Sequence, residues 1–252
     1  MLKLRAVKKS FIGHFEPILK NIDLDIKAGE FCIVIGSNGS GKSTLMRSIS
    51  GEYAIDSGEI LIDGKNIAMN NRSDYIATVT QDISKGTIAE MTLLENMILS
   101  DLRGKNASFS FYSKRREEIL RVLKELNMNL EQYIDLPLRV LSGGQRQMIA
   151  ILMAISSKPK ILLLDEHTSA LDPKTQSIIM DYSAINITKF NITSLMITHK
   201  LDDAINYGNR LIMLHQGNIV IDVSGKEKKD LKVSQLLQLF HKFEDIALKG
   251  GE

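Results

Sequence analysis

The stretch Gly36-Ser-Asn-Gly-Ser-Gly-Lys-Ser-Thr44 lies between an apolar run, Phe31-Cys-Ile-Val-Ile35, and a segment with helical periodicity. A glycine-rich turn between a buried strand and a helix lets backbone N–H groups point inward around phosphate oxygens. In such a loop the lysine, here Lys42, reaches the β- and γ-phosphates of a nucleotide, and the Ser43 hydroxyl coordinates Mg²⁺. The predicted phosphate-binding residues are Gly36, Ser37, Asn38, Gly39, Ser40, Gly41, Lys42, Ser43 and Thr44.

Two acidic residues follow another buried strand, Ile161-Leu-Leu-Leu164. The first, Asp165, is suited to hold Mg²⁺ through water opposite the phosphate loop. The second, Glu166, is placed to polarise the attacking water, although an acid at a strand end can also be merely solvated. The pair predicts a metal ligand and a catalytic base side by side.

A third motif, Leu141-Ser-Gly-Gly-Gln145, precedes the helical run Arg146 to Ser156. We expect its backbone donors and the Ser142 hydroxyl to lie at a helix N-terminus with no local partner, which favours binding of an anion. An ordinary loop could have the same residues, but here the phosphate loop, this motif and the acidic strand end occur in order. The candidate contacts are Ser142, Gly143, Gly144 and Gln145.

Periodicity outside these motifs predicts an α/β protein. Alternating apolar residues in the first 30 positions indicate a small antiparallel β layer. Apolar runs at 161–164, 194–198 and 211–214, separated by helical stretches, indicate a parallel sheet, and the Gln216-Gly217 turn predicts a final hairpin. Apolar residues at every third or fourth position between about 82 and 140 indicate an inserted helical region.

Composition excludes several classes of protein. The 252 residues have 32 Lys and Arg against 30 Asp and Glu, a formal net charge of +2, which gives no reason to expect nucleic acid as a partner. The single cysteine, Cys32, lies in an apolar run and is expected to be a small buried hydrophobe. The longest apolar stretch, Met148 to Ile155, is too short to cross a bilayer, and the start of the chain offers no secretory signal.

With the three motifs in order, the chain resembles the nucleotide-binding subunit of ATP-binding cassette (ABC) transporters over essentially its whole length. The resemblance implies a P-loop NTPase of the RecA-like type, with ATP and Mg²⁺ as ligands. It also implies one domain over 1–252. Its expected parts are a nucleotide-binding core at 1–81 and 143–225, a helical subdomain at 82–142 and a C-terminal helical tail at 226–252.

The resemblance assigns further residues to the site. Gln81, after the predicted strand at 76–80, is similar to the glutamine that contacts Mg²⁺ and the attacking water. Asp172, in Ser169-Ala-Leu-Asp172, belongs to a segment that lines the dimer interface, and His199 resembles the histidine that contacts the γ-phosphate. An aromatic residue that stacks on adenine is expected upstream of the phosphate loop, and Phe11 is our choice, with Phe15 as the alternative.

The same resemblance implies partners. Each ATP is expected between the phosphate loop of one subunit and the Leu-Ser-Gly-Gly-Gln motif of another, in a head-to-tail homodimer or with a paralogous subunit. Transmembrane permease subunits would hold the chain at the cytoplasmic face of the cell membrane, in contact with the segment Asp82 to Leu99, where Met91, Leu94 and Ile98 form one helical stripe. Details near Gln81 and after Glu166 resemble bacterial importers of amino acids or related small solutes, which work with an extracytoplasmic substrate-binding protein.

Alternatives remain open at this point. A soluble ABC ATPase can serve as an assembly scaffold, as in iron–sulfur cluster biogenesis, and an exporter subunit would carry the same motifs. A chromosome-maintenance ATPase is disfavoured, because Lys42 and Ser142 are too close in sequence for a long coiled coil. Two residues depart from the family pattern: His167 stands where proline is usual, and Met153 where many members have arginine. Near the end of the chain, a helix is expected to carry Leu236, Leu237, Phe240 and Phe243 on one face, either packed on its own domain or free to interact.

Overall fold

A computed structural model describes residues 1–66, 69–101 and 109–249. The parts of the predicted helical subdomain and tail at 102–108 and 250–252 lie outside the described residues. The strands are β1 Leu2–Lys9, β2 Leu19–Ile26, β3 Phe31–Ile35, β4 Ser57–Ile62, β5 Lys65–Asn66, β6 Ile76–Thr80, β7 Ile161–Asp165, β8 Thr193–Ile197, β9 Arg210–His215 and β10 Asn218–Ser224. The α-helices are α1 Lys42–Ser50, α2 Leu93–Asp101, α3 Phe109–Glu125, α4 Gly143–Ser156, α5 Pro173–Lys189, α6 Leu201–Asn206, α7 Gly225–Asp230 and α8 Val233–Lys249. Short 3₁₀ turns lie at Met69–Asp74, Ile83–Lys85, Leu130–Tyr133 and Leu138–Val140.

The central sheet has the strand order β10-β9-β3-β8-β7-β6 among the described residues. From β9 to β6 all neighbouring strands are parallel, as the sequence predicted. The strand β10 is antiparallel to β9, because the Gln216-Gly217 turn has left-handed backbone angles at both residues and reverses the chain without a crossover. The strand β3 precedes the phosphate loop, and β7 leads into the acidic pair. Only β8 lies between these two parallel strands, so their carboxyl ends lie at the same edge of the sheet.

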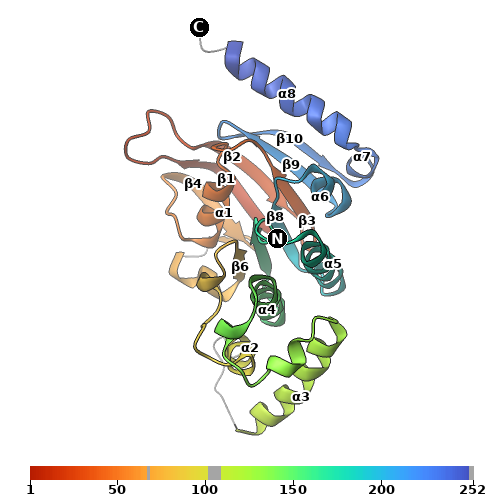
Figure 1. The fold of residues 1–252 in the computed structure, drawn as a ribbon. Coiled ribbons are helices and arrows are strands. Elements are labelled where there is room, and N and C mark those ends of the chain that lie inside the picture. The colour runs from red at the N-terminus through yellow and green to blue at the C-terminus, as the bar shows by residue number, and fades with distance from the viewer. Residues whose placement is uncertain (67–68, 102–108, 250–252) are drawn as a thin grey trace.

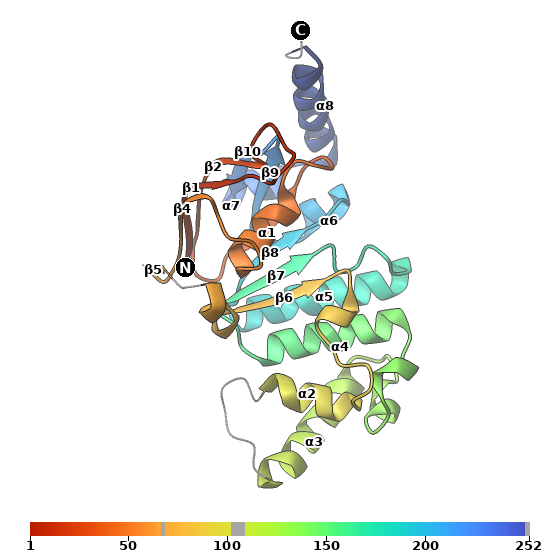
Figure 2. The same ribbon diagram turned by 90° about the vertical axis from the view of Figure 1, so that its left-hand side faces the viewer.

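A second sheet, with the order β2-β1-β4-β5, confirms the antiparallel layer predicted at the start of the chain. Its inward side chains pack with α1 against one face of the central sheet (Figures 1 and 2). The helices α4 and α5 cover the opposite face. Residues therefore alternate between two cores along each central strand: Cys32 and Val34 of β3 belong to the first core, and Ile33 and Ile35 to the second.

The inserted helical region lies at the end of the molecule opposite α8, below α4 in Figure 1. The helices α2 and α3 pack through buried residues such as Leu94, Ile98 and Leu123. The predicted stripe is wrong at Met91, because the α2 helix begins only at Leu93. The buried Asn96 side chain fixes the backbone that precedes the helix. Its amide accepts a hydrogen bond from the Ile88 N–H at 2.8 Å and donates one to the Ile88 carbonyl at 2.9 Å.

The C-terminal helix α8 projects from the β9–β10 side of the molecule (Figure 1). Leu236 is buried, and Phe240 and Phe243 are partly buried against the larger core. Leu237 is 44% exposed, so the prediction that all four residues share one face is wrong at Leu237. The reason is helical geometry. Residues 236, 240 and 243 are spaced by four and three positions and so share one face, whereas residue 237 points about 100° away from residue 236.

Within the described ranges, no helix combines the length and the hydropathy that a membrane-spanning segment requires. This result agrees with the short apolar runs in the sequence. Cys32 is buried as expected, and burial raises the pKa of its thiol to about 12.

Candidate functional site

The phosphate loop leaves β3 at the carboxyl edge of the central sheet and enters α1. Two of its glycines have backbone conformations that exclude other residues. Gly36 has φ 150°, and a Cβ atom there would come 2.2 Å from the Leu214 carbonyl oxygen. Gly41 has φ 105°, and a Cβ atom would meet the Ile18 carbonyl oxygen at 2.9 Å. The loop is thus packed tightly against neighbouring backbone, which holds its open side toward solvent.

Lys42 lies inside this loop and is buried. Its Nζ donates to the carbonyl oxygens of Gly36 and Ser37, each at 2.9 Å. Burial lowers the pKa of Lys42, and the nearby Glu166 and Asp165 carboxylates oppose this shift. Phosphate oxygens would compete with the two carbonyls for the ammonium protons, and a charged acceptor gives the stronger hydrogen bond.

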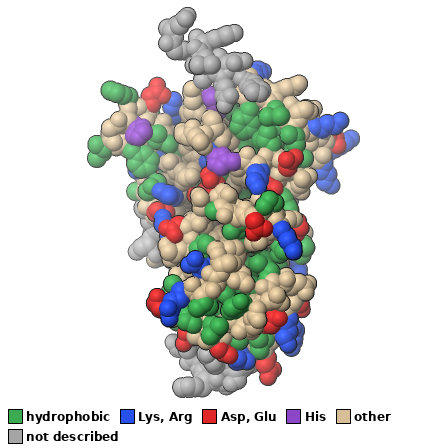
Figure 3. All heavy atoms as spheres, viewed as in Figure 1, with side chains coloured by type: hydrophobic (Ala, Val, Ile, Leu, Met, Phe, Trp, Pro, Cys, Tyr) green, Lys and Arg blue, Asp and Glu red, His purple; other side chains and the backbone are tan. Residues whose placement is uncertain are grey.

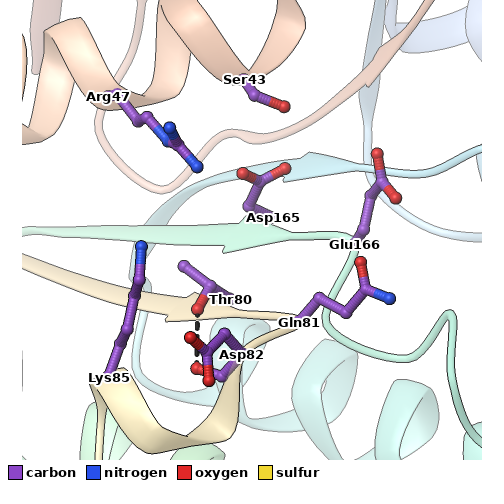
Figure 4. Close-up of a pocket in the computed structure, with 8 residues that line it drawn as sticks. All are labelled: Ser43, Arg47, Thr80, Gln81, Asp82, Lys85, Asp165 and Glu166. Atoms are coloured by element: carbon purple, nitrogen blue, oxygen red, sulfur yellow. Dashed lines mark hydrogen bonds between the residues drawn. The ribbon is translucent and has the colours of Figure 1, made fainter. Parts of the chain in front are cut away.

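A pocket of about 440 Å³ brings together residues from α1, β6 and β7 (Figure 4). In this view Ser43 and Arg47 extend from α1 above, the Thr80–Lys85 segment lies below, and Asp165 lies between them. The residues around the pocket are Ser43, Arg47, Thr80, Gln81, Asp82, Lys85, Asp165 and Glu166. The structure therefore gathers into one pocket four of the five side chains that the sequence predicted for metal binding and catalysis: Ser43, Gln81, Asp165 and Glu166. The fifth, His199, lines a neighbouring cavity that Glu166 also lines.

Arg47 and Lys85 also line this pocket and were not predicted. Arg47 donates to the Tyr53 hydroxyl at 2.7 Å. The signal for Arg47 was present, because it follows Ser43 by four residues and so shares its face of the helix. Lys85 lies in a 3₁₀ turn whose periodicity is too short to detect.

The donors around this pocket fit Mg²⁺. Ser43, Gln81 and Asp165 offer a hydroxyl, an amide and a carboxylate oxygen, the ligand types that Mg²⁺ prefers. Burial and the adjacent Glu166 raise the pKa of Asp165, which a divalent cation would reverse. In the described part of the chain no three His, Cys, Asp or Glu side chains form a metal site by themselves. Such a sparse donor set suits an ion that takes its remaining ligands from phosphates and water.

Glu166 has an unusual backbone conformation, with φ 49°. Its carbonyl accepts from Ser169 Oγ at 2.9 Å, which closes a tight turn after β7. Its Oε1 lies 2.6 Å from His199 Nε2, at the end of β8. Two of the three predicted catalytic side chains, Glu166 and His199, are therefore in direct contact. The turn directs the Glu166 carboxylate out of the strand toward the phosphate loop.

A second pocket, of about 320 Å³, adjoins the first on the other side of the loop, and Ser43 and Glu166 line both. Phe11 and His14 from the β1–β2 loop line it together with residues 38–39 and 41–44 of the phosphate loop. Phe11 packs edge-on against Tyr53, with ring centroids 5.2 Å apart. Phe15 does not line this pocket. The location agrees with Phe11 as the residue chosen for adenine, and this role stays a prediction.

The Leu-Ser-Gly-Gly-Gln motif begins α4 away from both pockets. Ser142 Oγ accepts from the Gln145 N–H at 3.3 Å, and Gln145 Oε1 accepts from the Ser142 N–H at 3.1 Å. The expectation that these groups lack a local partner is therefore wrong: they form a capping box, which satisfies both. The amides of Gly143 and Gly144 lie in the first turn, where a helix offers no acceptor, and remain the donors available to an anion.

Asp172 is also outside both pockets. It caps α5, where its carboxylate accepts from the Thr175 N–H at 3.0 Å, and this hydrogen bond lowers the pKa of Asp172. A Cβ atom on Gly144 would come 2.6 Å from the Thr175 Cγ2 atom, so the starts of α4 and α5 are in close contact. One chain thus presents two separate surfaces, the phosphate loop with its pockets and the paired helix starts.

His167 is buried behind the Glu166 turn. Among the described residues, its Nε2 has no hydrogen-bond partner. The ring lines a cavity of about 210 Å³ together with Gln176, Lys200 and Asp203. Burial lowers the pKa of His167 to about 4, so the ring is neutral at pH 7. The residue that departs from the family pattern is thus part of the interior beneath the candidate base.

We expect His167 to make the fold sensitive to mild acid. The pKa of His167 is 6.5 ordinarily and about 4 in the folded chain, so the unfolded chain binds the proton more tightly. The folded chain therefore has its full stability with respect to His167 above pH 6.5, where the ring is neutral in both states, and loses free energy of unfolding as the pH falls toward 4. At pH 5 the loss should be about 2 kcal/mol. Urea unfolding of the wild type and of His167→Gln at pH 7 and pH 5 measures it. An equal loss of stability in both proteins would contradict the prediction.

The chain is similar to known proteins in both sequence and structure. A family model described as ABC transporter matches residues 19–169. The tyrosine transport ATP-binding protein of Clostridioides difficile (strain R20291) is 42% identical over 247 residues, 95% of this chain and 98% of that protein. The spermidine/putrescine import ATP-binding protein PotA of Haemophilus influenzae is 36% identical over 90% of this chain, which spans only 59% of PotA. The dimeric ATP-binding cassette MJ0796, solved in a post-hydrolysis state with ADP and Pi, has a TM-score of 0.75 and 31% identity, and covers 89% of this chain and 98% of its own.

Proposed function

The chain belongs to the ABC transporter family, and from this membership we propose that it is the subunit that hydrolyses ATP to power a bacterial importer of amino acids or related small solutes. The observation that carries the proposal is the pocket beside the phosphate loop that Ser43, Gln81, Asp165 and Glu166 line together. The tyrosine transport relative, which matches this chain nearly end to end, supports the amino-acid class.

The chemistry follows from the positions of the side chains. The loop amides and Lys42 bind the β- and γ-phosphates, and Phe11 contacts the adenine. Ser43, Gln81 and Asp165 would hold Mg²⁺, which neutralises charge on the phosphates. Glu166 orients the attacking water and draws its proton, and His199, which is 2.6 Å from Glu166, would contact the γ-phosphate.

The active form is a head-to-tail dimer in this proposal. Within one chain, Ser142, Gly143 and Gly144 line neither of the two pockets beside the phosphate loop. A second copy can bring them to it, as expected for a two-fold interface, and the dimeric MJ0796 cassette supports this arrangement. ATP then forms part of the interface, and its hydrolysis favours opening.

The partners follow from the transport role. Transmembrane permease subunits would hold the chain at the cytoplasmic face of the membrane, and an extracytoplasmic binding protein would deliver the solute. The surface that we assign to the permease is the exposed segment from Ile83 to Glu90, beside Gln81, in which the Ile88 side chain is exposed. The transported solute never contacts this subunit, so the site does not encode its identity.

Ile88→Arg tests the transport role. The side chain points to solvent outside both nucleotide pockets, so ATP hydrolysis by the isolated chain should stay within about twofold of the wild type. A bulky charge in a helix-binding surface should abolish both stimulation by the permease and transport. The measurement is ATP hydrolysis and solute uptake in vesicles that contain the copurified permease.

Ile185→Arg is the matched control, since Ile185 is exposed on α5 and lies in neither nucleotide pocket. It should leave stimulation and uptake unchanged. If Ile88→Arg transported normally, the assigned surface would be wrong. If purification repeatedly returned soluble assembly proteins and no permease, the scaffold alternative would replace the importer.

A further inference from the structure

Two large hydrophobic side chains at the tip of the β1–β2 loop are completely exposed. Ile12 and Phe15, which we call the loop tip, have relative exposures of 106% and 108%. The loop is nevertheless ordered by a turn, in which the His14 N–H donates to the Phe11 carbonyl at 3.1 Å and Gly13 takes φ 89°. Figure 3 shows this loop at the upper left, with hydrophobic side chains and a histidine at the surface. A defined turn that holds apolar groups in water indicates a contact surface.

The loop tip borders the nucleotide pocket. Phe11 and His14, from the same turn, line the second pocket together with Asn38 and Gly39 of the phosphate loop. The Phe11 ring contacts its own chain: it packs edge-on against Tyr53, and Lys9 Nζ lies 5.1 Å from its ring centroid. Ile12 and Phe15 instead point away from the chain. A partner that binds over the phosphate loop would therefore contact these two side chains as well.

A second exposed apolar surface precedes the Leu-Ser-Gly-Gly-Gln motif. Leu136 is 44% exposed and Val140 is 50% exposed, and we call the segment 136–140 the pre-motif segment. Backbone hydrogen bonds fix it: Leu138 and Arg139 donate to the carbonyls of Met91 and Ala89, each at 3.1 Å. Arg139 is its single charge and pairs with Glu90 of the same chain at 3.3 Å. The surface left for a partner therefore has two apolar side chains, Leu136 and Val140, beside one exposed charge that is already paired within the chain.

We propose that in the closed dimer the loop tip of each protomer packs against the pre-motif segment of its partner. The inference rests on the head-to-tail dimer of the proposed function and extends it to a specific contact. In a two-fold interface, a phosphate loop that faces Ser142 of the partner brings the neighbours of each into contact. The loop tip neighbours the phosphate loop in space, and Val140 precedes Ser142 by two residues. Both surfaces are ordered and carry large apolar side chains that the described residues of one chain leave exposed, so each can bury the apolar side chains of the other.

Cross-linking tests this contact directly. Phe15→Cys and Val140→Cys are combined in a Glu166→Gln chain, and a short bismaleimide is added with and without ATP. We expect covalent dimers in high yield only with ATP. The native Cys32 is buried with a raised pKa and should not react. The matched control pairs Phe15→Cys with Ile185→Cys, which is exposed on α5 and should give no dimer.

Sedimentation of the same samples distinguishes a failure of the proposed contact from a failure of the head-to-tail dimer. ATP-dependent dimers without the Phe15–Val140 cross-link would overturn the contact and leave the head-to-tail dimer standing. Absence of any ATP-dependent dimer would overturn both. Cross-linking with equal yield in the absence of ATP would show contact between open chains and would also overturn the proposal.

A double-mutant cycle provides a second readout without new cysteines. Phe15→Ser and Val140→Ser should each weaken ATP-dependent dimerisation about tenfold, and together by clearly less than the product, because they remove the same contact. ATP binding by the monomer, measured below the dimerisation range, should change less than about twofold. If Phe15→Ser instead weakened monomer binding of ATP and left dimerisation of the ATP-bound chain unchanged, Phe15 would contact the nucleobase, and the proposal would be wrong.

Discussion

Replacement of Glu166 by glutamine should lower the rate of ATP hydrolysis at least about 100-fold while ATP still binds. The amide keeps the size of the carboxylate but cannot accept the proton of the attacking water. Because hydrolysis normally opens the dimer, the variant should accumulate as an ATP-bound dimer. The position after β7, at the junction of both nucleotide pockets, is the structural reason for this expectation.

Phosphate release and size-exclusion chromatography with and without ATP measure the two effects. Glu59→Gln is the control, since Glu59 pairs with Arg5 on the surface at 2.9 Å, far from the site in sequence and in neither nucleotide pocket. It should leave the rate unchanged. Normal turnover by the Glu166 variant would remove this residue from the role of catalytic base.

Lys42→Ala and Ser142→Arg should each abolish hydrolysis, for different reasons. The first removes the ammonium that now binds two loop carbonyls and would bind phosphate, so ATP binding itself should fail. The second replaces a capping residue at an exposed helix start with a long side chain, so the isolated chain should still bind ATP. The loss of the cap should cost stability of about 1 kcal/mol, which is too little to unfold the chain.

Mixing the two inactive variants gives the sharper result. A mixed dimer has one site with intact Lys42 from one chain and intact Ser142 from the other, whereas its second site has both lesions. Equal mixing should therefore restore about a quarter of the wild-type rate if the sites act independently. Each variant mixed with itself is the control. Absence of any recovery, with mixed dimers demonstrated by differential tags, would contradict composite sites.

Local sequence patterns predicted the framework well. The apolar run before Gly36, the acidic residues after Leu164 and the hairpin at Gln216-Gly217 each depend on neighbouring residues only, and the structure has the expected strands and turns there. The two-sheet arrangement follows from alternation near the start of the chain. The convergence of Ser43, Gln81 and Asp165 in space needed the family resemblance, because residues far apart in sequence carry no local signal of contact.

Other features depended on geometry that patterns do not resolve. The Ser142 side chain was expected to be free, but Gln145 stands three residues later, the spacing of a capping box, and satisfies it. Leu237 was expected to share one face with Leu236, Phe240 and Phe243, yet helical spacing directs it to solvent. The environment of His167 could not be predicted either, since one buried side chain among polar neighbours leaves no periodic trace.

The turn at Glu166 has a consequence for how such a protein evolves. A left-handed backbone is uncommon for a residue with a long side chain, and it costs free energy that a glycine or an asparagine would largely avoid. Selection for thermal stability alone would therefore remove the glutamate from this position. In the proposed mechanism, the glutamate at this position trades stability for activity. Laboratory evolution toward heat resistance should accordingly yield inactive chains unless turnover is selected at the same time.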